Sequence, residues 1–448
     1  MISQLKRLIP RSSLEGVRSV FHFAKAQIAA ARYGYPAKKL VLIGITGTKG
    51  KTSTTVTTGR LLNLCGIKTG YISTAEICDG VTTISNPYHM TTIDAVQMQK
   101  TLNIMVKSGC THAVIEMSSQ GLAQHRHQGL AGFDIAAFLN LFPEHIEAHG
   151  SLEKYALAKA ILFENLRPCG IALIKSTALK ADMMLAHVPP HAQGYFVDTT
   201  HDFTVVAPPK QLYKTIKINS VLYKSHFSAS FELENLYFAL KIAQLVVSPE
   251  QSTQKNLDRW DVRVLQHISE LGSISGRMEF VVESEKIDIM IDYAHEPESM
   301  KQLLNTLTGW KKEGVYSSIV HVVSCDGAGR DDWKKPIMGE ISYQNADFTI
   351  FTTDNYEQGD NPEQIVALLT QNLEKNLTHG VGLANRTEAF EMALSVARKK
   401  TRAQKKVLIV STGVGNEHGL TRPEGRIPWN EKEVWQQLLG VKKTALDC

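Results

Sequence analysis

Short apolar runs alternate with amphipathic stretches along most of this chain. Runs typical of buried strands lie at residues 40–43, 69–73, 112–115, 135–139 and 170–174. Between them, apolar positions recur with helical spacing at residues 54–65, 98–108 and 152–165. Strands that alternate with helices of this length predict an α/β fold, with a mostly parallel sheet covered by helices on both faces.

A second alternating pattern begins near residue 276. Residues 189–230 carry short β-branched and aromatic runs that predict a small antiparallel sheet, and residues 235–247 return to a helix. Further strand-like runs follow at residues 287–291, 318–323, 348–352 and 406–410. A chain of 448 residues is too long for one ordinary core. We therefore expect a short segment at 1–39, a central domain at 40–275 and a second, Rossmann-like α/β domain at 276–448.

The most informative stretch follows the first predicted strand and reads Gly44-Ile-Thr-Gly47-Thr-Lys-Gly50-Lys51-Thr52-Ser53. A strand that ends in glycines and then opens a helix presents backbone N–H groups, and the positive end of the helix dipole, to one anion. Lys51 has the spacing to reach terminal phosphates, and Thr52 the spacing to place a hydroxyl on Mg²⁺. Ile45 stands where the commonest phosphate loop has a glycine, so this is a narrower variant. The stretch predicts a triphosphate site made of Gly47, Thr48, Lys49, Gly50, Lys51, Thr52 and Ser53.

Polar residues follow the next predicted strands. Glu116 ends one run, and Asn140 and His145 follow another. Because ligands in parallel sheets bind at the carboxyl ends of the strands, we expect these side chains near the phosphate loop. A carboxylate there can bind Mg²⁺ directly or through water. Lys159 lies in an otherwise apolar helical stretch, where it either belongs to the site or extends its ammonium group to water.

The composition is that of a soluble globular protein. No apolar run approaches the roughly 20 residues needed to cross a bilayer, and the first residues do not resemble a secretory signal. The six cysteines include no C-x-x-C pair, which argues against a zinc site and a disulfide framework. We expect a cytoplasmic monomer that binds small molecules and no nucleic acid.

The first 39 residues are strongly basic. They hold Lys6, Arg7, Arg11, Arg18, Lys25, Arg32, Lys38 and Lys39 against the single acid Glu15. Four of the basic residues recur every seventh position, and residues 17, 20, 21, 24 and 28 form an apolar face of the same helix. We expect this amphipathic helix to dock on the next domain with its charges in water. The alternative is weak contact of residues 1–35 with a membrane surface or an anionic ligand.

The order of these motifs resembles the Mur ligases, and among them the MurE branch. The first domain carries Thr91-Thr92, Glu116-Met-Ser-Ser-Gln-Gly-Leu122, Gln124-His-Arg126, Asn140-Leu-Phe-Pro-Glu-His145 and Tyr155-Ala-Leu-Ala-Lys159. The second carries Gly276-Arg-Met-Glu279, Asp292-Tyr-Ala-His295, Asp326-Gly-Ala-Gly-Arg330 and Arg386-Thr-Glu-Ala389. The similarity extends from about residue 40 to residue 440.

The resemblance implies roles by position. It implies phosphate binding by Lys51, metal binding by Thr52, Glu116 and His145, and carbamylation of Lys159, whose anionic form would support a second Mg²⁺. It implies contacts to a muramoyl-peptide acceptor from Thr91, Thr92, Ser118 and Arg126. It implies contacts to ATP from Asn140, Arg277, Asp292 and His295. It implies contacts to the incoming amino acid from Asp354, Asn355, Gly413 and Glu417.

The implied reaction is the ATP-dependent formation of an amide bond in peptidoglycan biosynthesis. A carboxylate is a poor electrophile, so its attack on the γ-phosphate of ATP makes an acyl phosphate with a good leaving group. An amine then attacks the acyl carbon, and the tetrahedral intermediate releases phosphate. Lys51 and Mg²⁺ would neutralise charge, and the remaining groups would align the reactants.

The chain departs from the family pattern at three main places, one of which is the family's G-K-G-H-E motif, here Gly413-Val-Gly415-Asn416-Glu417. The family's uridine-binding domain should precede the phosphate loop, and about 40 residues are too few for a domain. Diaminopimelate-adding members read D-N-P-R where this chain has Asp354-Asn355-Tyr356-Glu357, which makes lysine, ornithine or another amino acid at least as suitable a substrate as diaminopimelate. Two alternatives stay open: a folylpolyglutamate-synthase-like or poly-amino-acid ligase with an acceptor that lacks UDP, and a non-catalytic subunit of a complex.

Overall fold

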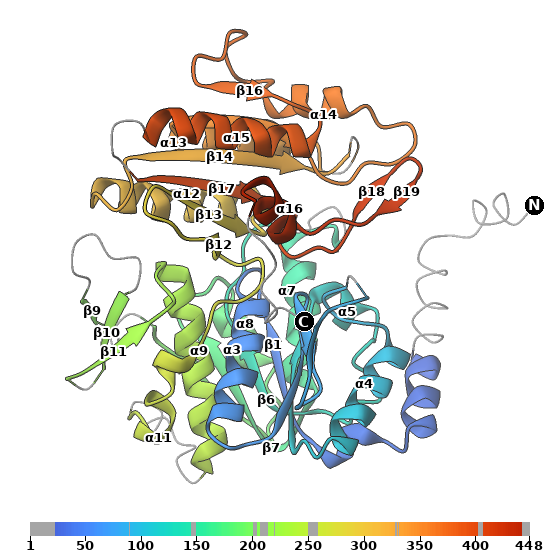
Figure 1. The fold of residues 1–448 in the computed structure, drawn as a ribbon. Helices are drawn as coiled ribbons and strands as arrows, with labels where there is room; N and C mark the ends of the chain where they lie inside the picture. The colour runs from blue at the N-terminus through green and yellow to red at the C-terminus, as the bar shows by residue number, and fades with distance from the viewer. Residues whose placement is uncertain are drawn as a thin grey trace, which may run out of the picture. The chain divides into compact units, whose positions relative to one another are not determined.

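The computed structural model describes residues 23–88, 90–144, 149–199, 204–206, 214–218, 220–249, 259–327, 329, 331–401 and 406–440. The chain forms two compact units, one mainly from the residues before Gly272 and the other mainly from Gly272 onward (Figure 1). Among the helices within the described ranges, none is long and apolar enough to cross a membrane.

The first unit is built on an eight-stranded sheet. Its strands, in spatial order, are β4 (Thr83–Ser85), β3 (Glu76–Cys78), β2 (Thr69–Ile72), β5 (His112–Glu116), β1 (Val41–Thr46), β6 (Phe133–Phe138), β7 (Leu166–Lys175) and β8 (Gln193–Val197). In this spatial order, β2, β5, β1, β6, β7 and β8 pair in parallel with their neighbours. Strand β3 pairs in an antiparallel manner with both β2 and β4 at one edge of the sheet. The α/β class with a mostly parallel sheet is confirmed.

Helices connect these strands and cover the sheet. They are η1 (Pro36–Lys39), α3 (Lys51–Leu64), α4 (Ala95–Lys107), α5 (Ser119–Ala123), α7 (Leu152–Glu164), α8 (Ala181–Ala186), α9 (Ser230–Val247), α11 (Val262–Leu265) and η3 (Ile268–Glu270). Helices α3 and α9 lie side by side (Figure 1), and Thr54 Oγ1 is 3.5 Å from Asn235 Oδ1. At Gly44 a Cβ atom would lie 2.7 Å from Leu162 Cδ1 of α7, so only glycine lets this helix pack so closely on β1.

Strand β1 is longer than the apolar run at residues 40–43 from which it was predicted. It continues through Ile45, which is fully buried, to Thr46. The position at which other phosphate loops have a glycine is therefore part of the central strand here. A β-branched side chain suits that place because it packs between the helices on the sheet.

The basic helix is described from residue 23, and helical geometry continues to residue 32. Its buried residues are Ala26, Ala29 and Ala30, whereas Ile28 is 70% exposed. Ala24 is also exposed, so the expected apolar face is wrong at both of its described residues, Ala24 and Ile28. The helix approaches the loop closely at Gly129, where a Cβ atom would lie 2.9 Å from Ala26 O and 3.1 Å from Ala30 Cβ, and the alanines on this face allow that approach. Residues 17, 20 and 21 of that face, and Arg11 and Arg18, lie outside the described residues.

The segment after β8 forms a separate three-stranded sheet of β9 (Thr204–Val206), β10 (Lys214–Ile218) and β11 (Val221–Ser225). The predicted small sheet in this region is thus present, but part of the segment belongs elsewhere. Strand β8 extends the main sheet by pairing in parallel with β7.

The second unit has a six-stranded sheet in the order β12 (Glu279–Val282), β13 (Ile287–Asp292), β17 (Val407–Thr412), β14 (Ser318–Cys325), β15 (Phe348–Thr353) and β16 (Gly380–Gly382). Only β12 pairs in an antiparallel manner among these strands. A hairpin of β18 (Leu420–Arg422) and β19 (Gly425–Ile427) follows β17. The helices are α12 (Pro297–Lys312), α13 (Lys334–Asn345), α14 (Pro362–Leu369), α15 (Arg386–Lys400) and α16 (Glu431–Leu438).

Alternation along the buried strands divides this sheet into two covered faces. Val320 and Val322 pack in one core with Phe390 of α15 and Trp435 of α16. His321 points to the opposite face, where its Nδ1 lies 2.7 Å from Ser342 Oγ of α13. This arrangement leaves the carboxyl ends of the parallel strands as the edge from which the predicted site residues of this unit extend.

Candidate active site

The phosphate loop connects the end of β1 to the start of α3. Gly50 caps the helix with φ of 81°, and a Cβ atom there would lie 2.1 Å from Asn235 Oδ1. Both facts require glycine at this position. No side chain caps the first turn of α3, which suits an N-terminus that receives an anion.

The two lysines of the loop have different partners. Lys51 Nζ donates to Gly47 O at 3.1 Å and to Thr48 O at 2.8 Å, so its ammonium group lies over the loop. Lys49 Nζ lies 2.6 Å from Glu144 Oε1 in an ion pair at the rim. Lys51 therefore has the place from which a cation contacts phosphate oxygens, as predicted from its spacing.

Asn140 follows β6 and holds the loop in shape. Its Oδ1 accepts hydrogen bonds from Thr48 N at 3.0 Å and Lys49 N at 2.8 Å, and its Nδ2 donates to Lys49 O at 3.1 Å. The amide is thus engaged with the backbone of the loop. Direct contact of Asn140 with ATP stays a prediction, whereas its positioning of the loop follows from these bonds.

Glu116, at the end of β5, lies beside the first turn of α3. It is 1% exposed. Thr52 Oγ1 lies 3.1 Å and 3.0 Å from its two carboxylate oxygens, and Thr74 donates to Oε2 from both its N–H, at 2.7 Å, and its hydroxyl, at 3.0 Å. Thr52 and Glu116 present only oxygen atoms, the donors that Mg²⁺ prefers. Within the described ranges, no group of three or more His, Cys, Asp or Glu residues could hold a metal ion. A metal here would share its coordination with few protein ligands, as Mg²⁺ usually does.

Lys159 is inside the site. It is 1% exposed on α7, and its Nζ donates to Gly47 O at 2.7 Å and lies 4.3 Å from the centroid of the Tyr155 ring. The alternative in which its ammonium group extends to water is therefore wrong. Burial, followed by the charge of Lys51, holds the pKa of Lys159 well below its usual range, against the opposing effect of Glu144.

The predicted acceptor residues form one connected group next to Glu116. Thr91 Oγ1 lies 3.0 Å from Thr74 Oγ1, and Thr92 Oγ1 accepts from Ser118 N at 2.8 Å. Arg126 donates from Nη1 to Thr92 O at 2.6 Å. Motifs separated by about 30 residues in the sequence thus meet at the carboxyl end of β5, because Ser118 starts the next helix there and the chain before α4 crosses the same edge.

His145 lies outside the described residues. The nearby His149 is described, and its Nε2 is 3.0 Å from Ser119 Oγ. Burial, with the charge of Lys159, lowers its pKa, so a neutral ring is favoured. Two further residues of this site, Thr74 and Asn235, carried no motif that singled them out, and Tyr155 belongs to the Tyr155-Ala-Leu-Ala-Lys159 motif but had no role assigned to it. Thr74 joins Glu116 to Thr91, Asn235 lies against Gly50, and Tyr155 donates to Thr48 Oγ1 at 3.2 Å.

In the second unit, Asp292 joins two of the predicted motifs. Its carboxylate accepts from Met278 N and Ala294 N, each at 2.8 Å. Burial raises the pKa of Asp292, and the nearby Arg277 opposes this effect. The guanidinium group of Arg277 lies 4.4 Å from the centroid of the Tyr293 ring, and His295 Nδ1 is 2.8 Å from Tyr293 O. These residues therefore form one cluster after β13.

The residues predicted to contact the incoming amino acid lie after β15 and β17. Asp354 is buried and bonded to Ser324 and to Nη1 of Arg386, the latter at 3.0 Å. Burial raises the pKa of Asp354 to about 7, against the charge of Arg386. At Gly413, φ is +107° and a Cβ atom would lie 2.5 Å from Asp354 Oδ2, so glycine is required.

Two further side chains complete this group. Asn355 Oδ1 accepts from Thr421 N at 2.8 Å, which ties the strand end to β18. Glu417 Oε1 accepts from the Tyr293 hydroxyl at 3.3 Å, and burial together with Asp326 raises the pKa of Glu417. The cluster after β13 and the residues after β17 are therefore connected through Tyr293.

Comparison with known proteins agrees with both units. The model of the Mur ligase middle domain matches residues 45–243, and that of the Mur ligase glutamate ligase domain matches residues 276–413. A UDP-N-acetylmuramoyl-L-alanyl-D-glutamate–2,6-diaminopimelate ligase from Caldanaerobacter subterraneus subsp. tengcongensis is 30% identical, over 93% of this chain and 81% of its own length. A similar ligase from Chlorobium phaeobacteroides is 31% identical over 93% of this chain and 80% of its own length.

Solved structures show the same fold. A UDP-N-acetylmuramoyl-L-alanyl-D-glutamate–2,6-diaminopimelate ligase superposes with a TM-score of 0.55 and 26% identity, and the match covers 90% of this chain and 78% of that one. A folylpolyglutamate synthase from Mycobacterium tuberculosis, solved with ADP and AMPPCP, has a TM-score of 0.64 at 16% identity and covers 87% of this chain and 92% of its own. From its matched domains, its relatives and its fold, the chain belongs to the Mur ligases, a family of ATP-dependent amide ligases.

Proposed function

We propose that this protein is a MurE-type ligase that joins an amino acid to the carboxylate of a muramoyl peptide, with ATP as the energy source. The observation that carries the proposal is the connected group of Lys51, Thr52, Glu116, Thr74 and Thr91. It links a phosphate loop to the residues predicted to hold the acceptor, with contacts of 3.1 Å or less. An acceptor bound at Thr91 would therefore have its carboxylate close to the γ-phosphate of ATP bound at the loop.

Each residue has a role that follows from its chemistry. Lys51 balances the charge that develops as the acceptor carboxylate attacks the γ-phosphate, and Asn140 keeps the loop N–H groups directed at the phosphates. Thr52 and Glu116 would hold Mg²⁺, which when bound neutralises the β- and γ-phosphates. Thr92, Ser118 and Arg126 would orient the acceptor so that its carboxylate meets the γ-phosphate in line.

Lys159 is suited to carbamylation. Only a neutral amine adds to CO₂, forming an N–C bond and releasing one proton, and the lowered pKa of Lys159 favours that neutral form. The product is an anion in place of a cation. Its position beside Gly47 would place a negative group next to the phosphate loop, where it suits a metal ion.

The incoming amino acid is proposed to be lysine or ornithine. Glu357 is exposed and stands where diaminopimelate-adding members carry an arginine that pairs with a distal carboxylate. A glutamate repels that carboxylate and attracts a distal ammonium group. Tyr356 is held by the guanidinium group of Arg422, 4.4 Å from its ring centroid, so the replaced pair forms part of an ordered loop.

The reaction is tested by measuring phosphate release from ATP and Mg²⁺ with UDP-muramoyl dipeptide. We expect release that requires both the acceptor and a suitable amino acid. Release without the acceptor, or none across a full panel of amino acids, would contradict the assignment.

The choice of amino acid is tested with Glu357→Arg. We expect the ratio of kcat/KM for diaminopimelate to that for lysine to rise at least tenfold, because a charge-assisted hydrogen bond contributes about 1.5–3 kcal/mol. Glu363→Arg makes the same charge change on exposed α14 and serves as the matched control. An equal change in both variants would show that only net charge matters and would refute the role of Glu357.

A further inference from the structure

The described part of the N-terminal helix, residues 23–32, is attached to the first unit by one face. Ala26 packs against the loop at Gly129, where a Cβ atom would lie 2.9 Å from Ala26 O. Beside this contact, Lys25 Nζ donates to Asp94 Oδ2 at 2.8 Å, so one cation of the helix is paired with the same unit. These contacts determine which face of the helix points outward.

The outward face of this helix carries an apolar stripe. Ala24, Ile28 and Ala31 recur at the i, i+4 and i+7 spacing of one helix face, and all three are exposed. We call these three residues the outer stripe. Ile28 is 70% exposed, and Phe23 in the first turn and Tyr35 just after the helix are 47% and 40% exposed. One exposed apolar side chain is ordinary, but a row of them on one face indicates a surface that contacts another apolar body.

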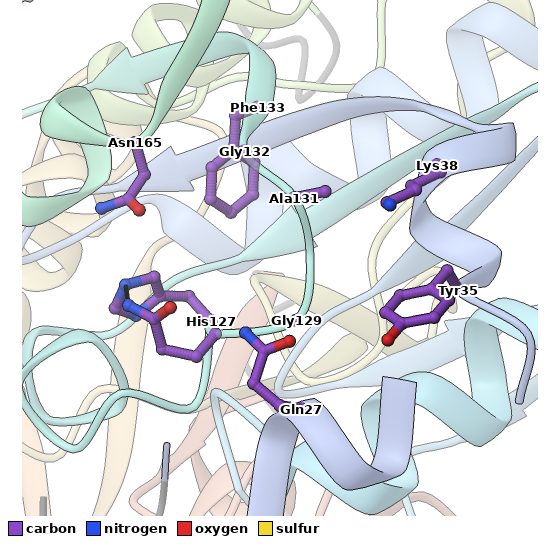
Figure 2. A pocket seen from close by; sticks show the side chains of 10 residues that line it. Gln27, Tyr35, Lys38, His127, Gly129, Ala131, Gly132, Phe133 and Asn165 are labelled. Carbon is purple, nitrogen blue, oxygen red and sulfur yellow. Dashed lines mark hydrogen bonds between the residues drawn. The ribbon is translucent and has the colours of Figure 1, made fainter. Parts of the chain in front are cut away.

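Cations lie beside the outer stripe. Arg32 is exposed in the last turn of the helix, and Lys38 and Lys39 of η1 are exposed as well. Figure 2 shows Lys38 near Tyr35, and its Nζ lies 4.7 Å from the centroid of the Tyr35 ring. The sequence from residue 23 to residue 39 contains no acidic residue. The outward face therefore combines apolar side chains with positive charge only.

The chain concentrates its positive charge in this segment. Residues 1–39 hold eight basic residues and one acid, which gives +7, whereas the whole chain has a net charge of +5. The remaining residues therefore carry −2. Such an asymmetry attracts an anionic partner. Because the cations lie next to apolar side chains, the complementary partner presents anionic groups over an apolar layer, as a lipid membrane does and a nucleic acid duplex does not.

This surface lies away from the phosphate loop. Tyr35 and Lys38 line a pocket of about 450 Å³, together with His127, Phe133 and Asn165 (Figure 2). Phe133 is the first residue of β6, and the phosphate loop lies beyond the other end of this strand, whose six residues span roughly 20 Å. The pocket leaves room for the phosphate of a lipid headgroup beside Lys38. A membrane contact at this end of the sheet does not cover the triphosphate site.

We propose that residues 23–39 form a docking surface for an anionic lipid membrane. The outer stripe enters the boundary between the headgroups and the acyl chains, while Arg32, Lys38 and Lys39 pair with lipid phosphates. The inner face of the helix stays on the first unit, so docking requires no unfolding. The helix lies on the membrane surface and does not span it. Membrane contact is independent of the ligase reaction and goes beyond it.

Cosedimentation with lipid vesicles tests the surface without any turnover. The full chain is mixed with vesicles of equal parts phosphatidylglycerol and phosphatidylcholine, and separately with vesicles of phosphatidylcholine alone. We expect binding to the anionic vesicles only, and weaker binding as salt is added, because salt screens exposed charges. Ile28→Ser and Arg32→Glu should each lower the affinity for anionic vesicles by about fivefold or more, since each removes one apolar or one cationic contact with the membrane.

Matched controls make the same changes at exposed positions outside this surface. Ile84 on β4 is 53% exposed, and Arg398 on α15 is exposed too, so Ile84→Ser and Arg398→Glu should bind vesicles like the wild type. Folding of each variant is checked by its melting temperature and its affinity for ADP. If Ile28→Ser does not fold, Ile28→Ala retains a strong helix former and should still weaken vesicle binding.

Several results would overturn the proposal. One is a wild type that does not bind anionic vesicles at millimolar lipid, or that binds phosphatidylcholine vesicles equally well. Another is normal vesicle binding by folded Ile28→Ser and Arg32→Glu, or an equal loss of binding in the two controls. Absence of ligase activity with normal vesicle binding would refute the proposed function alone.

Two other occupants of the surface give distinct results, and each would also overturn the proposal. If a second copy of the chain covers the outer stripe, sedimentation velocity shows a dimer that Ile28→Ser dissociates, and vesicles do not bind. If the cations serve a nucleic acid, a short DNA duplex binds at least as tightly as the anionic vesicles, and Ile28→Ser leaves that binding unchanged.

Discussion

Replacing Asn140 with alanine isolates the contribution of loop shape to nucleotide binding. The side-chain amide of Asn140 makes three hydrogen bonds to the backbone of Thr48 and Lys49 and reaches no other loop residue in the described structure. The variant removes these bonds without removing a charge. Because Thr48 N also donates to Asn140 O of the main chain at 3.1 Å, one of the three bonds is partly replaced.

The size of the effect follows from the bonds lost. A neutral hydrogen bond contributes about 0.5–1.5 kcal/mol, and two to three such bonds give roughly 2–3 kcal/mol. If binding the triphosphate requires the ordered loop, the variant must order it at this cost. At 1.4 kcal/mol per factor of ten, the Kd for ATP should rise roughly 30- to 150-fold.

The assay is calorimetric titration of ATP into Asn140→Ala, with Asn63→Ala as the matched control. Asn63 is also half-buried, and its amide also makes three backbone bonds, to Gly59 O and to both Thr69 N and Thr69 O. It lies at the far end of α3. Both variants should lose similar unfolding free energy, but only Asn140→Ala should lose affinity for ATP.

Two results would refute this reasoning. One is a folded Asn140→Ala protein that binds ATP within twofold of the wild type. The other is an equal loss of affinity in Asn63→Ala, which would show that general stability, and not the shape of the loop, controls binding.

Three further predictions concern catalysis and stability. Lys51→Ala should lower kcat at least 100-fold with an unchanged melting temperature, since it removes charge stabilisation and no core contact; near-normal turnover would disprove the phosphate-loop role. Arg386→Met should cost about 3–5 kcal/mol in urea unfolding, because it leaves Glu431 and Asp354 as buried carboxylates without their cation, whereas exposed Arg398→Met should cost little. Burial lowers the pKa of His127 from 6.5 to about 4, so between these pH values the unfolded chain binds more protons than the folded chain. The contribution of His127 to the free energy of unfolding should therefore be complete above pH 6.5 and fall by about 3 kcal/mol toward pH 4. His127→Gln should lose this part of the acid dependence, and identical pH profiles would contradict it.

Local patterns predicted much of the fold correctly. The runs that begin at residues 69, 112, 287, 318 and 348 correspond to strands with the same first residue, because a buried parallel strand needs a continuous apolar run wherever it lies in the sheet. The phosphate loop was equally clear, since glycines and a lysine at fixed spacing reflect backbone geometry within a few residues. Where a pattern met a close tertiary contact it was less reliable, as Ile28 shows: the helix turns Ala26, Ala29 and Ala30 inward, and these small side chains allow its close approach to Gly129.

Some residues of the candidate site were predicted from local patterns, and others were identified only by the tertiary structure. Lys51, Glu116 and Lys159 were predicted from strand ends and motif order, and the structure places all three around Gly47 and Thr52. Thr74 and Asn235 had no local signal. Their roles depend on which loops meet at the sheet edge, and threonine and asparagine are common in ordinary turns.

The sequence by itself determined the class of fold, the triphosphate loop and the family, because each depends on residues close together in the chain or on the order of motifs. Only the tertiary structure decided that Lys159 is buried against the loop, that Asn140 holds it, and that a polar pocket with His127 in its wall lies at the other end of β6. Burial and hydrogen-bond partners come from segments that are distant in sequence. The packing of the whole unit, and no single segment, therefore sets the charge and the orientation of these side chains.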